Sequence, residues 1–321
     1  MKLAVGLDVG GTNMKCAVVR EDGAKLSFLS QPTEADGGME HVILRICSHI
    51  RATLLAANLT PTDIACIGIG IPGLIDPERG IVRKAANLGW EVYALADRIV
   101  DEFNGTPTYL DNDVRMAMLG EALVGAGKGF QHVMGVTMGT GLAAAMIINH
   151  EPYYGHRYLA GELGHIPFEP IPYRCNCGQL GCLETVASAS GLVRQLIDRL
   201  TSLSERPSYW RGIALESIQA SDLSVAYDAG DELAIDIFQH TGTMMCRGLV
   251  AAAILWSPEI IIIGGGGAQA GERILAPIRA ELERSLLPIY LESLQLVPAQ
   301  LGNDAGTIGS ALRALQRSKS R

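Results

Sequence analysis

One pattern of apolar residues and glycines occurs twice along the chain. Residues 2–9 form an apolar run that predicts a buried strand, two glycines then predict a turn, and residues 16–19 predict a second strand. Residues 134–139 match residues 5–10 with both glycines aligned, and apolar segments flank the match on either side. We therefore expect two copies of one strand-turn-strand unit, one in each of two domains.

The remaining apolar positions predict helices that alternate with strands. Helical spacing covers residues 39–58 and 232–256, and the second of these helices ends before Pro258. Buried strands are expected over residues 64–71 and 259–263. Helices that alternate with strands indicate the α/β fold class, with mixed sheets that carry helices on both faces.

Length and charge limit what the chain binds. Its 321 residues are enough for two domains with substantial cores. The net charge of −8 provides no basic excess for nucleic acid or an anionic membrane. The first strand begins at residue 2 without a secretory segment, and the longest apolar runs are far shorter than a membrane span. We therefore expect a cytoplasmic protein with no nucleic-acid or membrane partner.

Three of the seven cysteines have the spacing of a metal site. Cys175, Cys177 and Cys182 follow the pattern C-x-C-x4-C, and His165 lies ten residues before the first of them. Three thiolates and one imidazole are the ligand set of a closed, tetrahedral Zn²⁺ site without an open catalytic position. A disulfide or three buried free thiols are the alternatives, and the odd cysteine in a reducing compartment disfavours the disulfide. The spacing predicts structural zinc.

Two carboxylates lie beside this predicted metal site. Glu162 is three residues before His165, and Glu184 is two residues after Cys182. A histidine that binds metal normally uses its second nitrogen for an oriented hydrogen bond. We therefore interpret the element as a loop, held rigid by zinc, that binds a polyhydroxylated ligand. Loss of the zinc should therefore weaken binding of that ligand alone, because the glycine turns lie elsewhere in the chain.

The sequence G-E-L-G-H followed by C-x-C-G-x-x-G-C-L-E closely resembles the ROK family of bacterial sugar kinases and regulators, and the resemblance extends over nearly the whole chain. It implies an actin/hexokinase-like (ribonuclease H-like) fold of two domains with a central cleft. The small N-terminal domain would span residues 1–114, and the large domain with the zinc element residues 115–302. A helix at about 303–321 would pack back on the first domain. Pro172 replaces a usual glycine of the family but leaves the four ligands in place.

The resemblance also implies that paired phosphate loops bind Mg²⁺ and ATP. Asp8 would help to place the Mg²⁺, usually through water, and Mg²⁺ needs few protein carboxylates. On its own, Asp8 could cap a turn, and D-x-G-G-T suits an ordinary hairpin. The other implied ATP-binding residues are Gly10, Gly11, Thr12 and Asn13 in the first loop, Thr137, Gly139, Thr140 and Gly141 in the second, and Gly264, Gly265, Gly266 and Gly267 at the adenosine.

The implied reaction is ATP-dependent phosphorylation of a hexose at its 6-hydroxyl, with Asp113 as the catalytic base. The sequence alone leaves two roles open for Asp113, because a helix cap fits as well as a base. Asn87 could likewise be a turn former. The implied sugar-binding residues are Gly73, Asn87, Asn112, Asp113, Glu162, His165 and Glu184.

Glucose is the favoured hexose, because the segments P-G-L-I-D, N-L-G-W and L-G-N-D-A-G resemble the ROK glucokinases. Allose, fructose, mannose and N-acetylated amino sugars are the alternatives. A sugar-responsive repressor would need a DNA-binding helix-turn-helix before the first strand, and a non-catalytic sensor would lack the base or a phosphate loop. Both are less favoured by this sequence. The family is usually dimeric or tetrameric, so we expect a homodimer or homotetramer.

Overall fold

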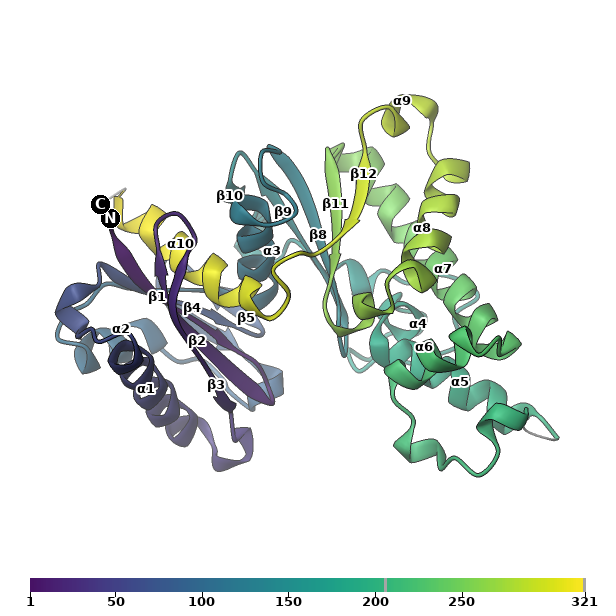
Figure 1. Ribbon diagram of the computed structural model, residues 1–321, viewed down its shortest axis with the longest axis horizontal. Coiled ribbons are helices and arrows are strands. Elements are labelled where there is room, and N and C mark those ends of the chain that lie inside the picture. The colour runs from purple at the N-terminus through teal and green to yellow at the C-terminus, as the bar shows by residue number, and fades with distance from the viewer. Residues whose placement is uncertain (205–206, 320–321) are drawn as a thin grey trace. The chain divides into compact units, whose positions relative to one another are not determined.

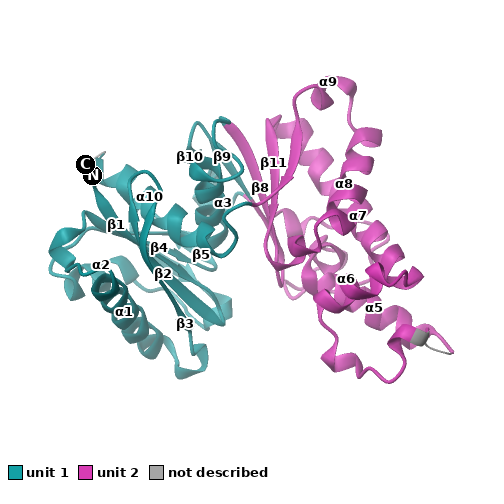
Figure 2. Cartoon of the chain, viewed as in Figure 1, with its two compact units in different colours: residues 1–131, 145–160, 300–321 teal, residues 132–144, 161–299 magenta. Residues whose placement is uncertain are grey.

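The computed structural model describes residues 1–204 and 207–319 and divides into two compact units (Figure 2). Unit 1 comprises Met1–Gln131, Ala145–Ala160 and Gln300–Arg321, and unit 2 comprises His132–Ala144 and Gly161–Ala299. None of the helices within the described residues has the length and apolar character that crossing a membrane requires.

Unit 1 is built on a five-stranded mixed sheet with the strand order β3-β2-β1-β4-β7 (Figure 1). The strands β1, β2 and β3 are antiparallel neighbours, whereas β4 runs parallel to β1 and β7 runs parallel to β4. A hairpin of β5 and β6 forms a separate small sheet. The bounds are β1 Leu3–Val9, β2 Asn13–Arg20, β3 Lys25–Pro32, β4 Cys66–Ile71, β5 Leu74–Asp76, β6 Ile81–Lys84 and β7 Thr108–Asn112.

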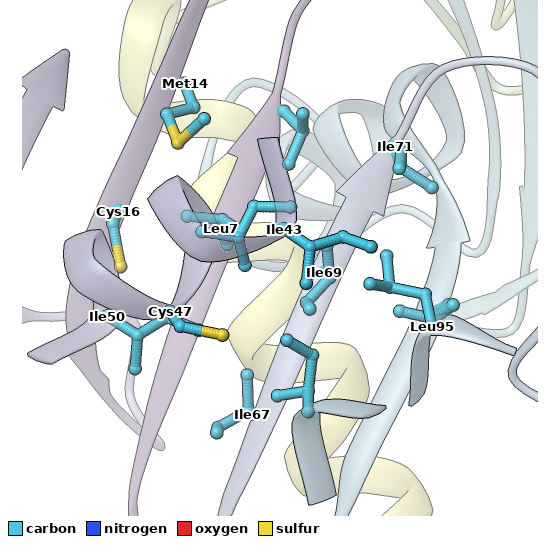
Figure 3. Close-up of a cluster of buried hydrophobic side chains, with 14 of the residues drawn as sticks. Leu7, Met14, Cys16, Ile43, Cys47, Ile50, Ile67, Ile69, Ile71 and Leu95 are labelled. Carbon is cyan, nitrogen blue, oxygen red and sulfur yellow. The ribbon is translucent and has the colours of Figure 1, made fainter. Parts of the chain in front are cut away.

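One face of this sheet packs on α1 (Met39–Ala56) and α2 (Leu95–Glu102). Successive strand residues project to opposite faces, so alternate residues of β1 enter this core. Leu7 lies there with Ile43 and Leu95, and all three are fully buried (Figure 3). Truncating such a leucine to alanine costs roughly 2–5 kcal/mol. This core fixes the sheet whose strand ends carry the candidate site.

The other face is covered by α10 (Ala305–Lys319), which also packs along α3 (Asp113–Val124). The helix backbone lies directly on the sheet, because a Cβ on Gly6 would come within 1.9 Å of the Thr307 carbonyl oxygen. α10 corresponds to the helix expected at about 303–321, of which residues 320 and 321 lie outside the described residues. Unit 1 extends beyond residue 114 and includes α3, which packs along α10. The expected division into domains of residues 1–114 and 115–302 stays a prediction.

The second sheet has the strand order β10-β9-β8-β11-β12 and repeats the plan of the first. Strand β8 begins 129 residues after β1 (132 − 3), and β9 begins 129 residues after β2 (142 − 13). β11 is parallel to β8, as β4 is to β1. The duplicated unit is therefore confirmed. The bounds are β8 His132–Met138, β9 Leu142–Ile148, β10 Glu151–Pro152, β11 Ile260–Gly264 and β12 Gln295–Pro298.

The remaining helices belong to unit 2. The longest, α7, is unbroken over the residues for which the sequence predicted a helix, and it packs on α8. The short helix α4 and the longer helix α5 directly follow the cysteine-rich segment, and the first residue of α5 donates its N–H to Gly139 in the β8–β9 turn. The bounds are α4 Glu184–Ala187, α5 Ala189–Ser202, α6 Ala220–Asp228, α7 Glu232–Trp256, α8 Glu272–Ser285 and α9 Pro288–Leu291.

Candidate active site

Asp113 is the first residue of α3, immediately after β7 ends at Asn112. Asn112 is the residue that caps the helix, because its Oδ1 accepts a hydrogen bond of 3.2 Å from the backbone N–H of Arg115. The alternative in which Asp113 is the cap is therefore wrong. The Asn112 Nδ2 donates to Asp113 Oδ1 at 3.0 Å and so orients the carboxylate.

Desolvation raises the pKa of Asp113 to about 7, and the negative charge of Asp8 contributes to the same rise. Hydrogen bonds from the backbone N–H groups of Val114 and Asp113 and the charge of Arg115 act in the opposite direction. Burial also raises the pKa of Asp8, and Lys15 opposes that rise. A carboxylate with a pKa near neutrality is suited to accept a proton at physiological pH.

Asp8 lies in a row of paired residues that crosses the first sheet. It is opposite Lys15 on β2 and Gly70 on β4, and Gly70 is opposite Asp111 on β7. Paired residues project to the same face, which here is the face that α10 covers. A Cβ on Gly306, in α10, would come within 2.5 Å of Asp8 Cγ. The glycine is thus needed to leave room for the Asp8 carboxylate.

The first phosphate loop is a tight turn held from one side. The Gly10 N–H donates to the Asn13 carbonyl oxygen at 2.9 Å. Thr33, which is fully buried, donates its N–H to the Thr12 carbonyl oxygen at 2.8 Å and its hydroxyl to the Gly10 carbonyl oxygen at 2.7 Å. Gly11, Thr12 and Asn13 remain exposed. No motif in the sequence identifies Thr33 as this support.

The two expected sugar loops contact other candidate residues of unit 1. Gly73 has φ of +105°, and a Cβ there would come within 2.1 Å of the Lys84 carbonyl oxygen, so a side chain does not fit. Its carbonyl oxygen accepts a hydrogen bond of 3.3 Å from Asn112 Nδ2. A Cβ added on Gly11 would lie 3.7 Å from the Cβ and the carbonyl oxygen of Asn87. Unit 1 therefore brings Gly73, Asn112 and Asp113 together, and Asn87 next to the first phosphate loop.

In unit 2, the four predicted metal ligands converge. One ligand atom from each of His165, Cys175, Cys177 and Cys182 lies within 4.8 Å of the others. The Cys177 and Cys182 sulfurs are 3.6 Å apart, and Cys175 Sγ is 3.7 Å from His165 Nδ1. Tetrahedral zinc with 2.3 Å bonds to sulfur places its ligand atoms about 3.8 Å apart, whereas a disulfide needs about 2.05 Å. The cysteines are free thiols, and the donor set fits zinc.

Glu184 connects this cluster to the second phosphate loop. Its Oε1 accepts from Cys175 Sγ at 2.8 Å and lies 3.8 Å from His165 Nδ1. Its Oε2 accepts from the Leu142 N–H at 3.4 Å, and a Cβ on Gly141 would lie 2.7 Å from the same oxygen. The phosphate loop is therefore in contact with the zinc element, contrary to what their separation in sequence suggested. Glu162 completes the group, with its Oε2 3.7 Å from His165 Nε2.

The second phosphate loop is held by the helices that follow the zinc element. The Gly139 N–H donates to the Gly141 carbonyl oxygen, and the Ala189 N–H donates to the Gly139 carbonyl oxygen, both at 2.9 Å. Ser190 Oγ donates to the Thr140 carbonyl oxygen. The Thr137 hydroxyl is buried and has no hydrogen-bond partner within the described parts of the chain.

The glycine run follows β11 next to this loop. Gly264, the last residue of β11, pairs with Thr137 on β8, so the run leaves the sheet beside the second phosphate loop. Gly266 begins a short 3₁₀ helix that ends at Ala270. Unit 2 thus brings the two predicted nucleotide segments and the residues Glu162, His165 and Glu184 into one connected group, separate in the chain from the Asp113 group of unit 1.

Comparisons with known proteins agree with this arrangement. The model of the ROK family matches residues 4–317. Glucokinases of Halalkalibacterium halodurans and Thermotoga maritima are 34% and 33% identical to the chain, over 98% and 96% of its length and 96% and 95% of theirs. A solved ROK family glucokinase from Streptomyces griseus, in complex with glucose and AMPPNP, is 33% identical with a TM-score of 0.82, covering 98% of this chain and 99% of that one.

The duplicated sheets and paired glycine loops place the chain in the actin/hexokinase-like class of folds, as its sugar-kinase neighbours also indicate. Within that class, the chain belongs to the ROK family.

Proposed function

We propose that the chain is a glucokinase that transfers the γ-phosphoryl group of ATP to the 6-hydroxyl of glucose. The observation that carries this proposal is the carboxylate of Asp113, which begins α3 with a pKa raised to about 7. Membership of the ROK family and 33% identity to a glucokinase solved with glucose and an ATP analogue support the choice of reaction.

In the proposed mechanism, Asp113 accepts the proton of the sugar hydroxyl as its oxygen attacks the γ-phosphorus and ADP leaves. Phosphoryl transfer depends on positioning and charge neutralisation, and the base need only collect the proton late in a loose transition state. The residues proposed to bind the sugar are Gly73, Asn87, Asn112, Glu162, His165 and Glu184.

The nucleotide is proposed to bind at the two phosphate loops, with its adenosine at the glycine run of residues 264–267. Mg²⁺, placed through Asp8, would neutralise phosphate charge when bound with ATP. Zn²⁺ on His165, Cys175, Cys177 and Cys182 would be structural, because the four protein ligands leave no open position. We further propose that the protein is cytoplasmic, has no nucleic-acid partner and forms a homodimer or homotetramer. Sedimentation of the purified protein would test the oligomeric state.

The test is ADP release measured across a panel of hexoses for the wild type, Asp113→Asn and Asp101→Asn. Removing a general base typically lowers turnover by about 10²- to 10⁴-fold, so Asp113→Asn should lose activity on glucose. Asp101 is exposed on α2, and its variant is the matched control that should keep full activity. Faster turnover of another hexose would reassign the substrate, and sugar binding without turnover would indicate a regulator. Wild-type turnover in Asp113→Asn would refute the assigned base.

A further inference from the structure

Asp111 and Arg115, which flank Asn112 and Asp113 in the sequence, form a buried ion pair. Arg115 Nε donates to Asp111 Oδ1 at 2.8 Å, and the two side chains are only 7% and 2% exposed. The cost of desolvating two charges is large, and well-packed apolar residues at such positions are often as stable or more stable. A contribution to stability is therefore a weak explanation for the Asp111–Arg115 ion pair. Its position next to the candidate base indicates a role in the active site.

Asp111 accepts three hydrogen bonds that fix the end of β7. Its Oδ1 also accepts from the Asn112 N–H at 2.7 Å, and its Oδ2 accepts from the Tyr154 hydroxyl at 2.7 Å. The peptide that joins Asp111 to Asn112 is thus held by the same carboxylate oxygen that holds the guanidinium of Arg115. Movement of that carboxylate would move the backbone that carries the candidate sugar ligand and base.

Arg115 is held from two further directions. Its Nη1 donates to the Tyr158 carbonyl oxygen at 3.4 Å, and its guanidinium lies 5.2 Å from the centre of the Tyr154 ring. Tyr154 in turn accepts from Arg313 on α10 at 3.3 Å, and Arg313 pairs with Glu151. The ion pair is therefore part of a network that joins β7 and α3 to α10 and to the segment after β10, all within unit 1.

The first turn of α3 transmits this order to Asp113. The Arg115 N–H binds Asn112 Oδ1, which leaves Asn112 Nδ2 directed at Asp113 Oδ1 and at the Gly73 carbonyl oxygen. We propose that Asp111 and Arg115 are positioning residues that hold the Asn112–Asp113 pair in the geometry required for phosphoryl transfer. The proposal rests on the proposed function, in which Asp113 is the base.

Loss of the pair should therefore affect the chemical step more than substrate binding. A displacement of about 1 Å at a reacting group can cost on the order of 10²-fold in rate. The double variant Asp111→Asn/Arg115→Met removes both charges together and so avoids leaving one charge buried alone. We expect kcat to fall by about 10- to 100-fold, with the KM for glucose raised because Asn112 is a proposed sugar ligand, and with the KM for ATP changed by less than about threefold.

Two variants accompany the double variant. Arg115→Lys keeps a positive charge next to Asp111 and should recover part of the lost kcat. Arg98→Met/Glu102→Gln removes another ion pair of the same i,i+4 spacing, with a 2.8 Å contact, on α2 of the same unit. This control should keep the wild-type kcat, and thermal melting should show that all the variants are folded.

A folded double variant with wild-type kcat would overturn the proposal. A fall in kcat that comes with a rise in both KM values and a fall in Tm would also overturn it, because that pattern indicates a general loss of folding. A crystal structure of the double variant provides a readout that is independent of activity. We expect the Asn112 amide to have moved away from Asp113 Oδ1, and an unchanged Asn112–Asp113 geometry would also overturn the proposal. If the wild type phosphorylates no hexose, the proposed function fails while this structural comparison still decides the positioning role.

Discussion

Replacing Asp113 with asparagine should stabilise the protein while abolishing its proposed activity. The pKa of Asp113 is raised from 3.8 to about 7 in the folded protein, mainly by desolvation. The folded state therefore binds this proton more tightly than the unfolded state, and ionisation of Asp113 opposes folding. The penalty is absent below about pH 4, grows as the pH rises toward 7, and is fully present above 7. Asparagine removes it.

The size of this effect follows from the change in proton affinity. Each tenfold change is about 1.4 kcal/mol, so a rise from 3.8 to about 7 corresponds to at most about 4 kcal/mol. Asp113 keeps some exposure, and solvent reaching the carboxylate reduces the penalty. We therefore expect Asp113→Asn to be about 1–3 kcal/mol more stable than the wild type at pH 8, which is roughly 2–9 °C in Tm.

Calorimetric melting at pH 8 and pH 5, without sugar or nucleotide, measures this difference. The stabilisation should be large at pH 8 and much smaller at pH 5, because the wild-type carboxyl is then mostly protonated. Asp101→Asn, on an exposed position of α2, controls for the general loss of one negative charge. The reasoning is refuted if Asp113→Asn is less stable than the wild type at pH 8, or if its advantage is the same at both pH values.

Three further predictions concern the rest of the site. Because Asp113 must be ionised to accept a proton, kcat/KM for glucose should fall about tenfold per pH unit below about pH 7, and a profile flat down to pH 5.5 would exclude this base. Cys177→Ala should lose about one zinc per chain, as metal analysis would show, and should raise the KM for glucose roughly 10- to 100-fold. Because Glu184 contacts Leu142 next to the second phosphate loop, the KM for ATP should rise too. The control Cys246→Ala should leave the zinc content and both KM values unchanged. Gly306→Ala should displace Asp8 and raise the Mg²⁺ concentration needed for half-maximal rate, with melting curves to confirm folding.

Much of the fold could be predicted because its signals are local. The duplicated unit is a run of apolar residues interrupted by glycines, and both the 129-residue offset and the long helix ending at Trp256 match the structure. The convergence of Cys175, Cys177 and Cys182 follows from their short spacing. The cap of α3 could not be predicted, because Asn112 and Asp113 are adjacent and both residue types cap helices well.

The supports of the site could not be predicted, because each depends on residues far apart in the chain. Asp111 accepts from Tyr154, and Thr33 holds the loop at Gly10, and neither pair has a shared motif. The contact between Glu184 and Leu142 likewise joins segments that the sequence presented as independent. Candidate ligands are thus visible in the sequence as residue types, whereas the groups that orient them become visible only when the strands and helices are assembled.

The two units use one device for this orientation. In unit 1, the Asp111 carboxylate accepts from the Asn112 N–H and from the side chains of Arg115 and Tyr154. In unit 2, the Glu184 carboxylate accepts from the Leu142 N–H, and its other oxygen lies beside Cys175 and His165 of the cysteine–histidine cluster. A carboxylate with several lone pairs can hold a backbone N–H and a side-chain donor at once, and so it fixes a loop to a packed element. The difference lies in the anchor, which is a buried arginine network in one unit and the cysteine–histidine cluster in the other. Disrupting either anchor should therefore loosen a ligand-bearing loop while its candidate ligands are all still present.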